Sequence, residues 1–158
     1  MECPHITNVI ASVLIQNDEA LHLPFLASRI EGSRYNPRRF SGLILRKVRP
    51  KGTIILYRSN RFLVVGSNSV EDCEILARRV VKDVRKIINK KVELREFKVV
   101  NIIAKGDIGR AISLDSLAEE PFAYKDDHFA GVVMKLEHLK CVMVYKSGKV
   151  TLNGAKTT

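Results

Sequence analysis

The order of apolar and polar residues predicts a run of strands and two helices in the first half of the chain. Residues 8–16 are rich in aliphatic side chains and indicate a strand, whereas residues 23–30 have helical spacing. Gly32 is expected to end that helix. Three strands are then predicted at residues 40–47, 53–58 and 61–66, joined by turns at residues 49–52 and 59–60. Together they form an antiparallel meander.

A longer helix is predicted at residues 69–89. Ser69 is its expected N-cap, and Glu71 and Asp72 stand in the first turn, where negative charge favours the helix dipole. Apolar residues recur at helical spacing, namely Ile75, Leu76, Val80, Val84, Ile87 and Ile88. The opposite face is basic and carries Arg78, Arg79, Lys82, Arg85 and Lys86. Residues 92–104 then return to a strand pattern.

Several segments of the first half recur in the second half in the same order. Residues 8–11 recur at 101–104, and the Phe, Gly and apolar pattern of residues 40–43 recurs at 129–132. The turn at residues 57–61 recurs at residues 145–149. Because the matching segments follow the same order at nearly constant spacing, they predict a tandem duplication, with residues 1–91 as the first repeat and 92–158 as the second. We expect an α+β fold in which one continuous antiparallel sheet has helices on one face.

Alternation along the strands leaves an apolar face that these helices do not cover. A monomer seldom exposes a contiguous apolar patch of this size unless it uses the patch for binding. In the first repeat the face holds Asn8, Ile10, Ser12, Phe40, Gly42, Ile44, Ile55, Tyr57, Arg61, Leu63 and Val65. In the second repeat it holds Asn101, Ile103, Phe129, Val133, Met143, Tyr145, Lys149, Thr151 and Asn153.

Charge points to a polyanionic partner. The 158 residues carry a net charge of +10, and residues 29–61 hold ten Lys or Arg residues against one acidic residue, Glu31. A concentrated basic segment favours nucleic acid binding, with a merely solubilising surface as the alternative. The chain lacks an apolar run long enough for a membrane span and an N-terminal signal pattern, so we expect it in the cytosol or nucleus.

Metal and disulfide chemistry find little support in the sequence. Cys3, Cys73 and Cys141 are widely spaced and form no CxxC pair. The four histidines lie in different segments. We therefore expect neither a disulfide framework, nor a metal site, nor a cofactor.

The motifs at residues 35–40, 59–61, 147–149 and 153–156 resemble the TATA-box-binding protein family. The resemblance covers residues 6–156. It implies a saddle-shaped sheet with helices on the convex face, whose concave face opens the minor groove of A·T-rich promoter DNA and kinks it. It also implies a nuclear, non-enzymatic initiation factor that nucleates the preinitiation complex. The implied partners are transcription factors IIA and IIB and the associated factors of the family.

The resemblance implies a role for each residue on this face. Phe40 with Tyr57, and Phe129 with Tyr145, would wedge between base steps. Asn8 and Asn101 would test for A·T pairs near the centre of the site. Apolar contacts would come from Ile10, Ile55, Leu63 and Ile103, and phosphate contacts from Arg46, Ser59, Arg61, Lys135, Ser147 and Lys149. The remaining DNA-contacting positions implied are Val65, Met143, Thr151 and Asn153.

Some positions depart from the family pattern. Val65 and Asn153 replace paired central threonines, which suggests a relative with relaxed sequence preference. Residues 124–128 replace the loop that docks factor IIB, with Lys125 and Asp127 as its charged candidates. The basic helix face at residues 78–86 would meet factor IIA and regulators.

The second repeat lacks the pattern of a long C-terminal helix before the sequence stops at Thr158. The apolar positions that such a helix would cover are Val132, Met134, Leu136, Val142, Val144, Val150 and Leu152. An uncovered strip of this kind favours self-association.

Three other functions stay open from the residues alone. Residues 106–109 (GDIG) match the GxxG clamp of an RNA-binding KH domain. Asp107 or Asp115 with His128 are the candidates for a hydrolase. The open apolar sheet also suits a scaffold that binds an apolar peptide.

Overall fold

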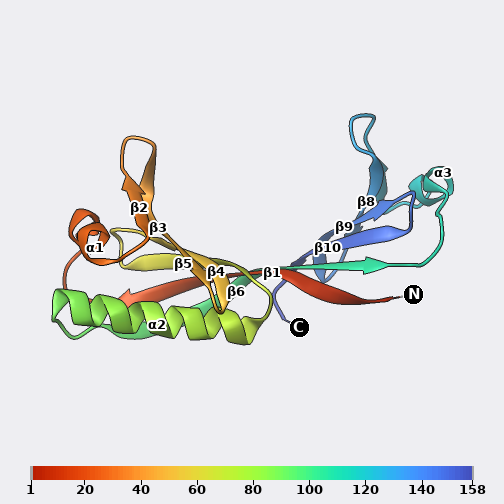
Figure 1. The fold of residues 1–158 in the computed structure, drawn as a ribbon. Coiled ribbons are helices and arrows are strands. Elements are labelled where there is room, and N and C mark those ends of the chain that lie inside the picture. The colour runs from red at the N-terminus through yellow and green to blue at the C-terminus, as the bar shows by residue number, and fades with distance from the viewer. Residues whose placement is uncertain (1, 158) are drawn as a thin grey trace. The chain divides into compact units, whose positions relative to one another are not determined.

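A computed structural model describes residues 2–157, and Thr158, the predicted end of the second repeat, lies outside the described residues. Strands make up about half of the chain (Figure 1). The strands are β1 (Glu2–Gln16), β2 (Ser33–Asn36), β3 (Phe40–Val48), β4 (Lys51–Leu56), β5 (Arg61–Ser67), β6 (Glu93–Asp107), β7 (Ala123–Lys125), β8 (Gly131–Leu136), β9 (Leu139–Tyr145) and β10 (Lys149–Ala155). The helices are α1 (Leu23–Arg29), α2 (Val70–Ile88) and α3 (Leu114–Ala118).

The chain divides into two compact units that have the same strand arrangement. Asn8–Val99 form the first unit, and the segment up to Thr7 together with the segment from Val100 onward forms the second unit. The hydrogen-bonded strand order is β2-β3-β4-β5-β1-β6-β10-β9-β8-β7, a sheet of ten strands. Strand pairs within each unit are antiparallel. An antiparallel sheet built by duplication is therefore confirmed, whereas the repeat boundary at residue 91 stays a prediction.

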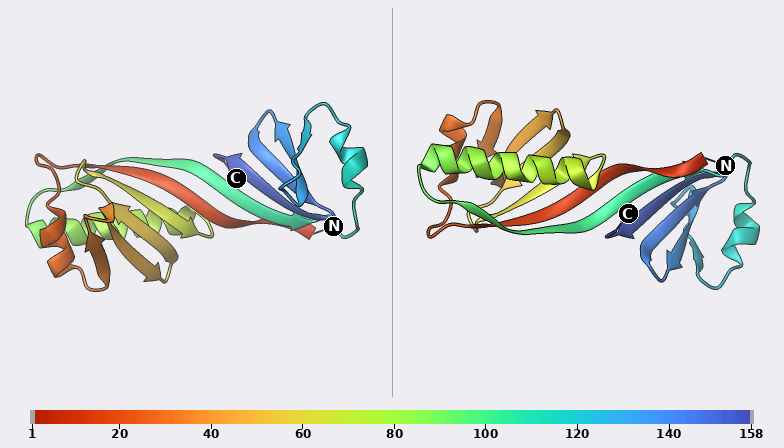
Figure 2. Two further views of the ribbon diagram at one scale, coloured as in Figure 1. Left: turned by 90° about the horizontal axis from the view of Figure 1, so that it is seen from above. Right: turned by 90° about the horizontal axis from the view of Figure 1, so that it is seen from below.

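In the first unit, α2 packs on one face of the sheet, against β4 and β5 (Figure 2). Gly52 of β4 allows this close approach, because a Cβ at that position would lie 2.5 Å from the Leu76 side chain of α2. The core of the unit lies between this helix and the sheet. It includes Val9, Ala11, Val13, Leu43, Leu45, Ile54, Leu56, Phe62 and Val64 from the strands, and Cys73, Leu76, Ala77, Val80, Val81 and Val84 from α2.

The helix prediction for α2 is confirmed in its bounds and its cap. The Ser69 hydroxyl accepts a hydrogen bond from the Asp72 N–H at 3.0 Å, and Asn89 ends the helix in a left-handed conformation. The predicted apolar face is wrong at Ile75, which is 42% exposed, because the buried stripe runs through Cys73, Ala77 and Val81 instead. Within residues 2–157, no helix is long and apolar enough to cross a membrane.

Strand boundaries differ from the predictions at several places. β1 begins at Glu2 instead of residue 8, and Thr7 in it donates a hydrogen bond to the Ile103 carbonyl of β6 at 3.3 Å. β4 covers Lys51–Leu56 instead of residues 53–58, because Arg58 belongs to the turn. The sequence does not predict the short strands β2 and β7, since they have only four and three residues and none of these side chains is fully buried.

Within the described residues of the second unit, the one helix is the five-residue α3, which contacts β7 and β8. The predicted uncovered strip is wrong in part: Val132, Val142 and Val144 are buried. Met134, Val150 and Leu152 are half-buried, and Leu136 is exposed. The self-association inferred from this strip stays a prediction, with a smaller apolar surface behind it.

Candidate nucleic-acid interface

An aromatic pair stands on the face of the first unit opposite α2. Phe40 begins β3 and Tyr57 follows β4, and their ring centroids lie 6.2 Å apart with planes inclined at 68°. Gly42 lies beneath the pair, because a Cβ there would be 2.7 Å from the Phe40 ring and 2.8 Å from Ile55. Glycine is therefore the residue that lets both rings stand against the sheet.

The second unit repeats this arrangement. Phe129 and Tyr145 have ring centroids 5.7 Å apart and planes inclined at 58°. Gly131 lies beneath them, and a Cβ there would be 3.0 Å from the Phe129 ring and 3.4 Å from Tyr145. Each unit thus presents one inclined aromatic pair over a glycine.

Aliphatic side chains extend this face toward β1 in the first unit and toward β6 in the second. Ile55 faces Leu63 across β4 and β5, and Ile10 faces Val65 across β1 and β5. In the second unit Met143 faces Thr151, and Ile103 faces Asn153. All eight side chains are half-buried, whereas their strand neighbours Val9, Ile54, Leu56, Val64, Ile102, Val142 and Val144 are buried. The face is thus largely apolar and accessible, as the alternation predicts, with Thr151 and Asn153 as its polar members.

A glycine bulge lies beside an asparagine in each unit. Gly66 (φ +85°) interrupts the β1–β5 register, and its N–H donates to Asn8 Oδ1 at 2.8 Å. Gly154 (φ +102°) interrupts the β6–β10 register. There Asn101 Nδ2 donates to Asn153 Oδ1 at 3.0 Å. The two asparagines predicted to read bases therefore have different partners.

Basic and hydroxyl side chains border the aromatic pairs. Arg46, Ser59, Arg61, Lys135, Ser147 and Lys149 are all exposed. Arg61 Nη1 donates to Ser12 Oγ at 3.5 Å. In the second unit a groove of about 530 Å³ is lined by His5, Lys105, Gly106, Asp107, Tyr145, Ser147, Lys149, Val150 and Thr151. Sequence reasoning missed His5 and Lys105, although Lys105 follows Ile103 by two residues and so shares its face.

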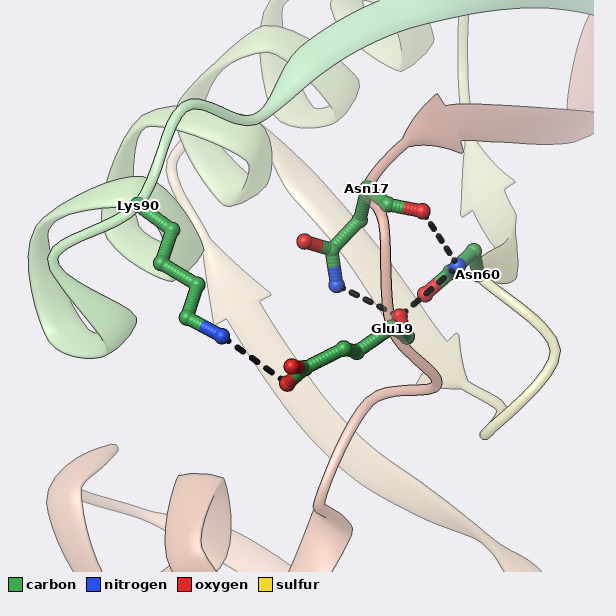
Figure 3. A network of polar contacts seen from close by, with 4 residues as sticks. All are labelled: Asn17, Glu19, Asn60 and Lys90. Atoms are coloured by element: carbon green, nitrogen blue, oxygen red, sulfur yellow. Dashed lines mark hydrogen bonds and ion pairs between the residues drawn. The ribbon is translucent and has the colours of Figure 1, made fainter.

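A polar network holds the turn that carries Ser59 and Arg61 (Figure 3). Asn60, with a left-handed φ of 60°, donates from Nδ2 to the carbonyls of Asn17 at 3.2 Å and Glu19 at 3.0 Å. Lys90 Nζ donates to Glu19 Oε2 at 2.8 Å, and this hydrogen bond lowers the pKa of the Glu19 carboxyl. The turn is thereby tied to the segment after β1, which fixes where Ser59 and Arg61 emerge.

The predicted partner-binding residues on α2 are not equivalent. Arg78 pairs with Glu74 at 2.6 Å, Arg79 donates to the Arg49 carbonyl at 2.9 Å, and Arg85 donates to the Val92 carbonyl. Lys82 and Lys86 are exposed, and among residues 2–157 they have no ion-pair partner. These two lysines are the free charges of this helix face.

The segment predicted to dock factor IIB is partly engaged within the second unit. Lys125 pairs with Asp115, and a hydrogen bond from the lysine lowers the pKa of that carboxyl. Asp127 is exposed.

The geometry does not assemble the alternative sites. Residues 106–109 continue from the end of β6 instead of joining two helices, and Asp107 Oδ1 accepts from the Gly109 N–H at 2.8 Å. Asp115 is held by Lys125. Within the described part of the chain, no group of three or more His, Cys, Asp or Glu side chains could hold a metal ion.

Comparison with known proteins identifies the fold and the family. The family described as "Transcription factor TFIID (or TATA-binding protein, TBP)" matches residues 3–87 and 96–158. A TATA-box-binding protein of Archaeoglobus fulgidus is 33% identical over 157 residues, which cover 96% of this chain and 85% of the relative. "TATA-box-binding protein-like 1" of Entamoeba histolytica is 32% identical, covering 99% of this chain and 73% of the relative.

A solved structure gives the same result at the level of the fold. "Methanococcus jannaschii TBP" matches with a TM-score of 0.78 and 28% sequence identity, over 98% of this chain and 89% of that chain. The predicted fold class is thus confirmed, and the KH and hydrolase interpretations are excluded. The chain belongs to the TATA-box-binding protein family, whose members are non-enzymatic, DNA-binding transcription initiation factors.

Proposed function

We propose that this chain binds A·T-rich promoter DNA in the minor groove and kinks it at both ends of the site. The observation that carries the proposal is the matched pair of aromatic rings over a glycine, one pair in each unit. Wedging by apolar side chains is the established mechanism of this family, so the mechanism itself is taken from the family. The saddle form and the repeats at residues 1–91 and 92–158 belong to the same proposal.

The accessible face supports one role for each kind of residue. Phe40 with Tyr57 and Phe129 with Tyr145 are the wedges, and the aliphatic strip of Ile10, Ile55, Leu63, Ile103 and Met143 would contact the unstacked groove. Because the minor groove of A·T pairs displays only acceptors, the amide N–H groups of Asn8 and Asn101 suit it. The exposed basic and hydroxyl residues border the wedges and would hold phosphates, which orient the complex.

Partner contacts are proposed from exposed charges: Lys82 and Lys86 have no ion pair within residues 2–157, whereas Lys125 is paired with Asp115. We propose that Lys82 and Lys86, with the neighbouring arginines of α2, meet factor IIA. The segment with Lys125 and Asp127 would meet factor IIB or an associated factor. In a eukaryotic cell the protein would act in the nucleus.

A binding series tests this function. Fluorescence anisotropy with A·T-rich duplex, G·C-rich duplex and single-stranded RNA should rank the A·T-rich duplex first. Phe40→Ala or Phe129→Ala should cost on the order of 2 kcal/mol, because each removes a wedge. Phe25→Ala is the matched control, since Phe25 on α1 is 38% exposed, like Phe40 at 40%.

Salt dependence separates phosphate contacts from wedges. Arg61→Gln or Lys149→Gln should weaken all duplexes alike and reduce the slope of log affinity against log salt by about one. Equal binding of RNA and duplex, or equal effects of Phe25→Ala and Phe40→Ala, would contradict the proposal.

A further inference from the structure

The amide groups beside the two bulges are arranged differently in the two units. In the first unit, Asn8 Oδ1 is occupied by the Gly66 N–H at 2.8 Å, and the residue that faces Ile10 across the sheet is Val65. In the second unit, Asn101 Nδ2 donates to Asn153 Oδ1 at 3.0 Å, and Asn153 is the residue that faces Ile103. Val65 and Asn153 are therefore equivalent positions with opposite chemistry.

These arrangements leave different groups free for a ligand. The first unit offers the N–H donors of Asn8 beside the methyl groups of Val65. The second unit offers the carbonyl oxygen of Asn101 and the N–H donors of Asn153, neither of which has another hydrogen-bond partner within residues 2–157. Turning both amides over would reverse their mutual bond and still leave one carbonyl free. The second unit thus presents an acceptor, whereas the first unit presents donors and an apolar surface.

We propose that the two units read their half-sites by different rules: the second unit accepts a G·C pair that the first unit rejects. This rests on the proposed minor-groove function. The guanine amino group is the one hydrogen-bond donor that base pairs add to the minor groove. It can donate to the free carbonyl of the Asn101–Asn153 pair. In the first unit it meets the methyl groups of Val65 and an Asn8 Oδ1 that already accepts from the Gly66 N–H, so it finds no free carbonyl and binding weakens about tenfold.

A protein whose two units differ can bind a symmetric site in either of two orientations. The difference between the units can therefore be measured from the cost of G·C pairs in one half-site or in both. On a symmetric A·T duplex both orientations are available. A single G·C pair in either half should cost only about twofold, because one of two orientations is lost. G·C pairs at the equivalent positions of both halves should cost about tenfold, because the first unit then always meets a guanine. If the halves were read alike, the double substitution would cost the square of the single one.

Two reciprocal variants test whether Val65 and Asn153 cause the different tolerance of G·C pairs. Each affinity is divided by the same variant's affinity for the A·T duplex, so general losses cancel. Asn153→Val should raise the cost of a single G·C pair from about twofold to about tenfold. Val65→Asn should lower the cost of G·C pairs in both half-sites toward the cost of a single G·C pair. This variant tests the proposal on its own if Asn153→Val does not fold.

The outcomes separate this inference from the function on which it rests. One outcome is that the parent bends and prefers A·T-rich duplex while G·C pairs in both half-sites cost the square of one G·C pair. In that case the inference is wrong and the proposed function stands. The inference is also wrong if neither variant changes its ratio. Failure of the parent to prefer or bend A·T-rich duplex would instead overturn the proposed function.

Discussion

The absence of a Cβ at one glycine in each unit lets the aromatic pair pack against the accessible face. Gly42 and Gly131 carry no side chain beneath the aromatic pairs, and the two rings of each pair fill that space. Native packing leaves little tolerance for an added methyl group at such contacts. The position of each aromatic pair therefore depends on the missing Cβ of the glycine as well as on the two aromatic side chains.

Gly42→Ala should therefore disturb the first pair without unfolding the unit. The new methyl group would press on the Phe40 and Ile55 side chains, both of which can move, so we expect a stability loss of about 1–2 kcal/mol. Affinity for A·T-rich duplex should fall as well, in the direction of Phe40→Ala. Chemical denaturation and anisotropy measure the two effects. In Gly131→Ala the methyl group would meet the Val144 carbonyl oxygen at 2.5 Å, so its stability loss should be larger.

Cys73 makes the stability of the first unit sensitive to alkaline pH. Burial raises the pKa of this thiol from its usual 9.0 to about 11. The folded state therefore keeps the thiol neutral while the unfolded state ionises. The stabilisation is complete below pH 9 and is lost as pH rises toward 11, by on the order of 2 kcal/mol. Urea titrations should show a smaller alkaline decline for Cys73→Ala than for the parent, and equal declines would contradict this.

Elements differ in how well their sequence specifies them. α2 is predictable because the Ser69 cap, the acidic first turn and the apolar spacing agree. The exposure of Ile75 is not predictable, since it depends on the rotation at which the helix meets β4 and β5. β2 and β7 are not predictable because they are only four and three residues long and bury no side chain fully. The Asn101–Asn153 bond requires the β6–β10 register, which depends on the Gly154 bulge.

Charge reversal on α2 should distinguish partner binding from DNA binding. Lys82→Glu with Lys86→Glu removes two charges that have no ion pair in the described structure, so stability should change little. The complex with DNA and factor IIA should weaken in gel-shift assays, while the binary DNA complex persists. Arg79→Glu also breaks the hydrogen bond to the Arg49 carbonyl, so it should lower stability as well. Equal loss of binary and ternary complexes would place α2 against DNA instead.

For the whole molecule, duplication is the feature that the sequence reveals best. Matching segments predict two units, and the structure repeats in both units the aromatic pair, the glycine beneath it and the glycine bulge. Duplication does not predict where the copies diverge in packing. Up to residue 157 the second unit has no long helix, yet Val132, Val142 and Val144 are buried, which periodicity does not predict.

The central claim is that each unit supplies one wedge, and the bend angle of bound DNA tests it most directly. Energy transfer between dyes at the ends of an A·T-rich duplex should report a strong bend with the parent. At saturating protein, Phe40→Ala and Phe129→Ala should each reduce the bend, and the double variant should reduce it further, with Phe25→Ala as the control. If the double variant bends DNA as the parent does, the aromatic pairs are not the wedges.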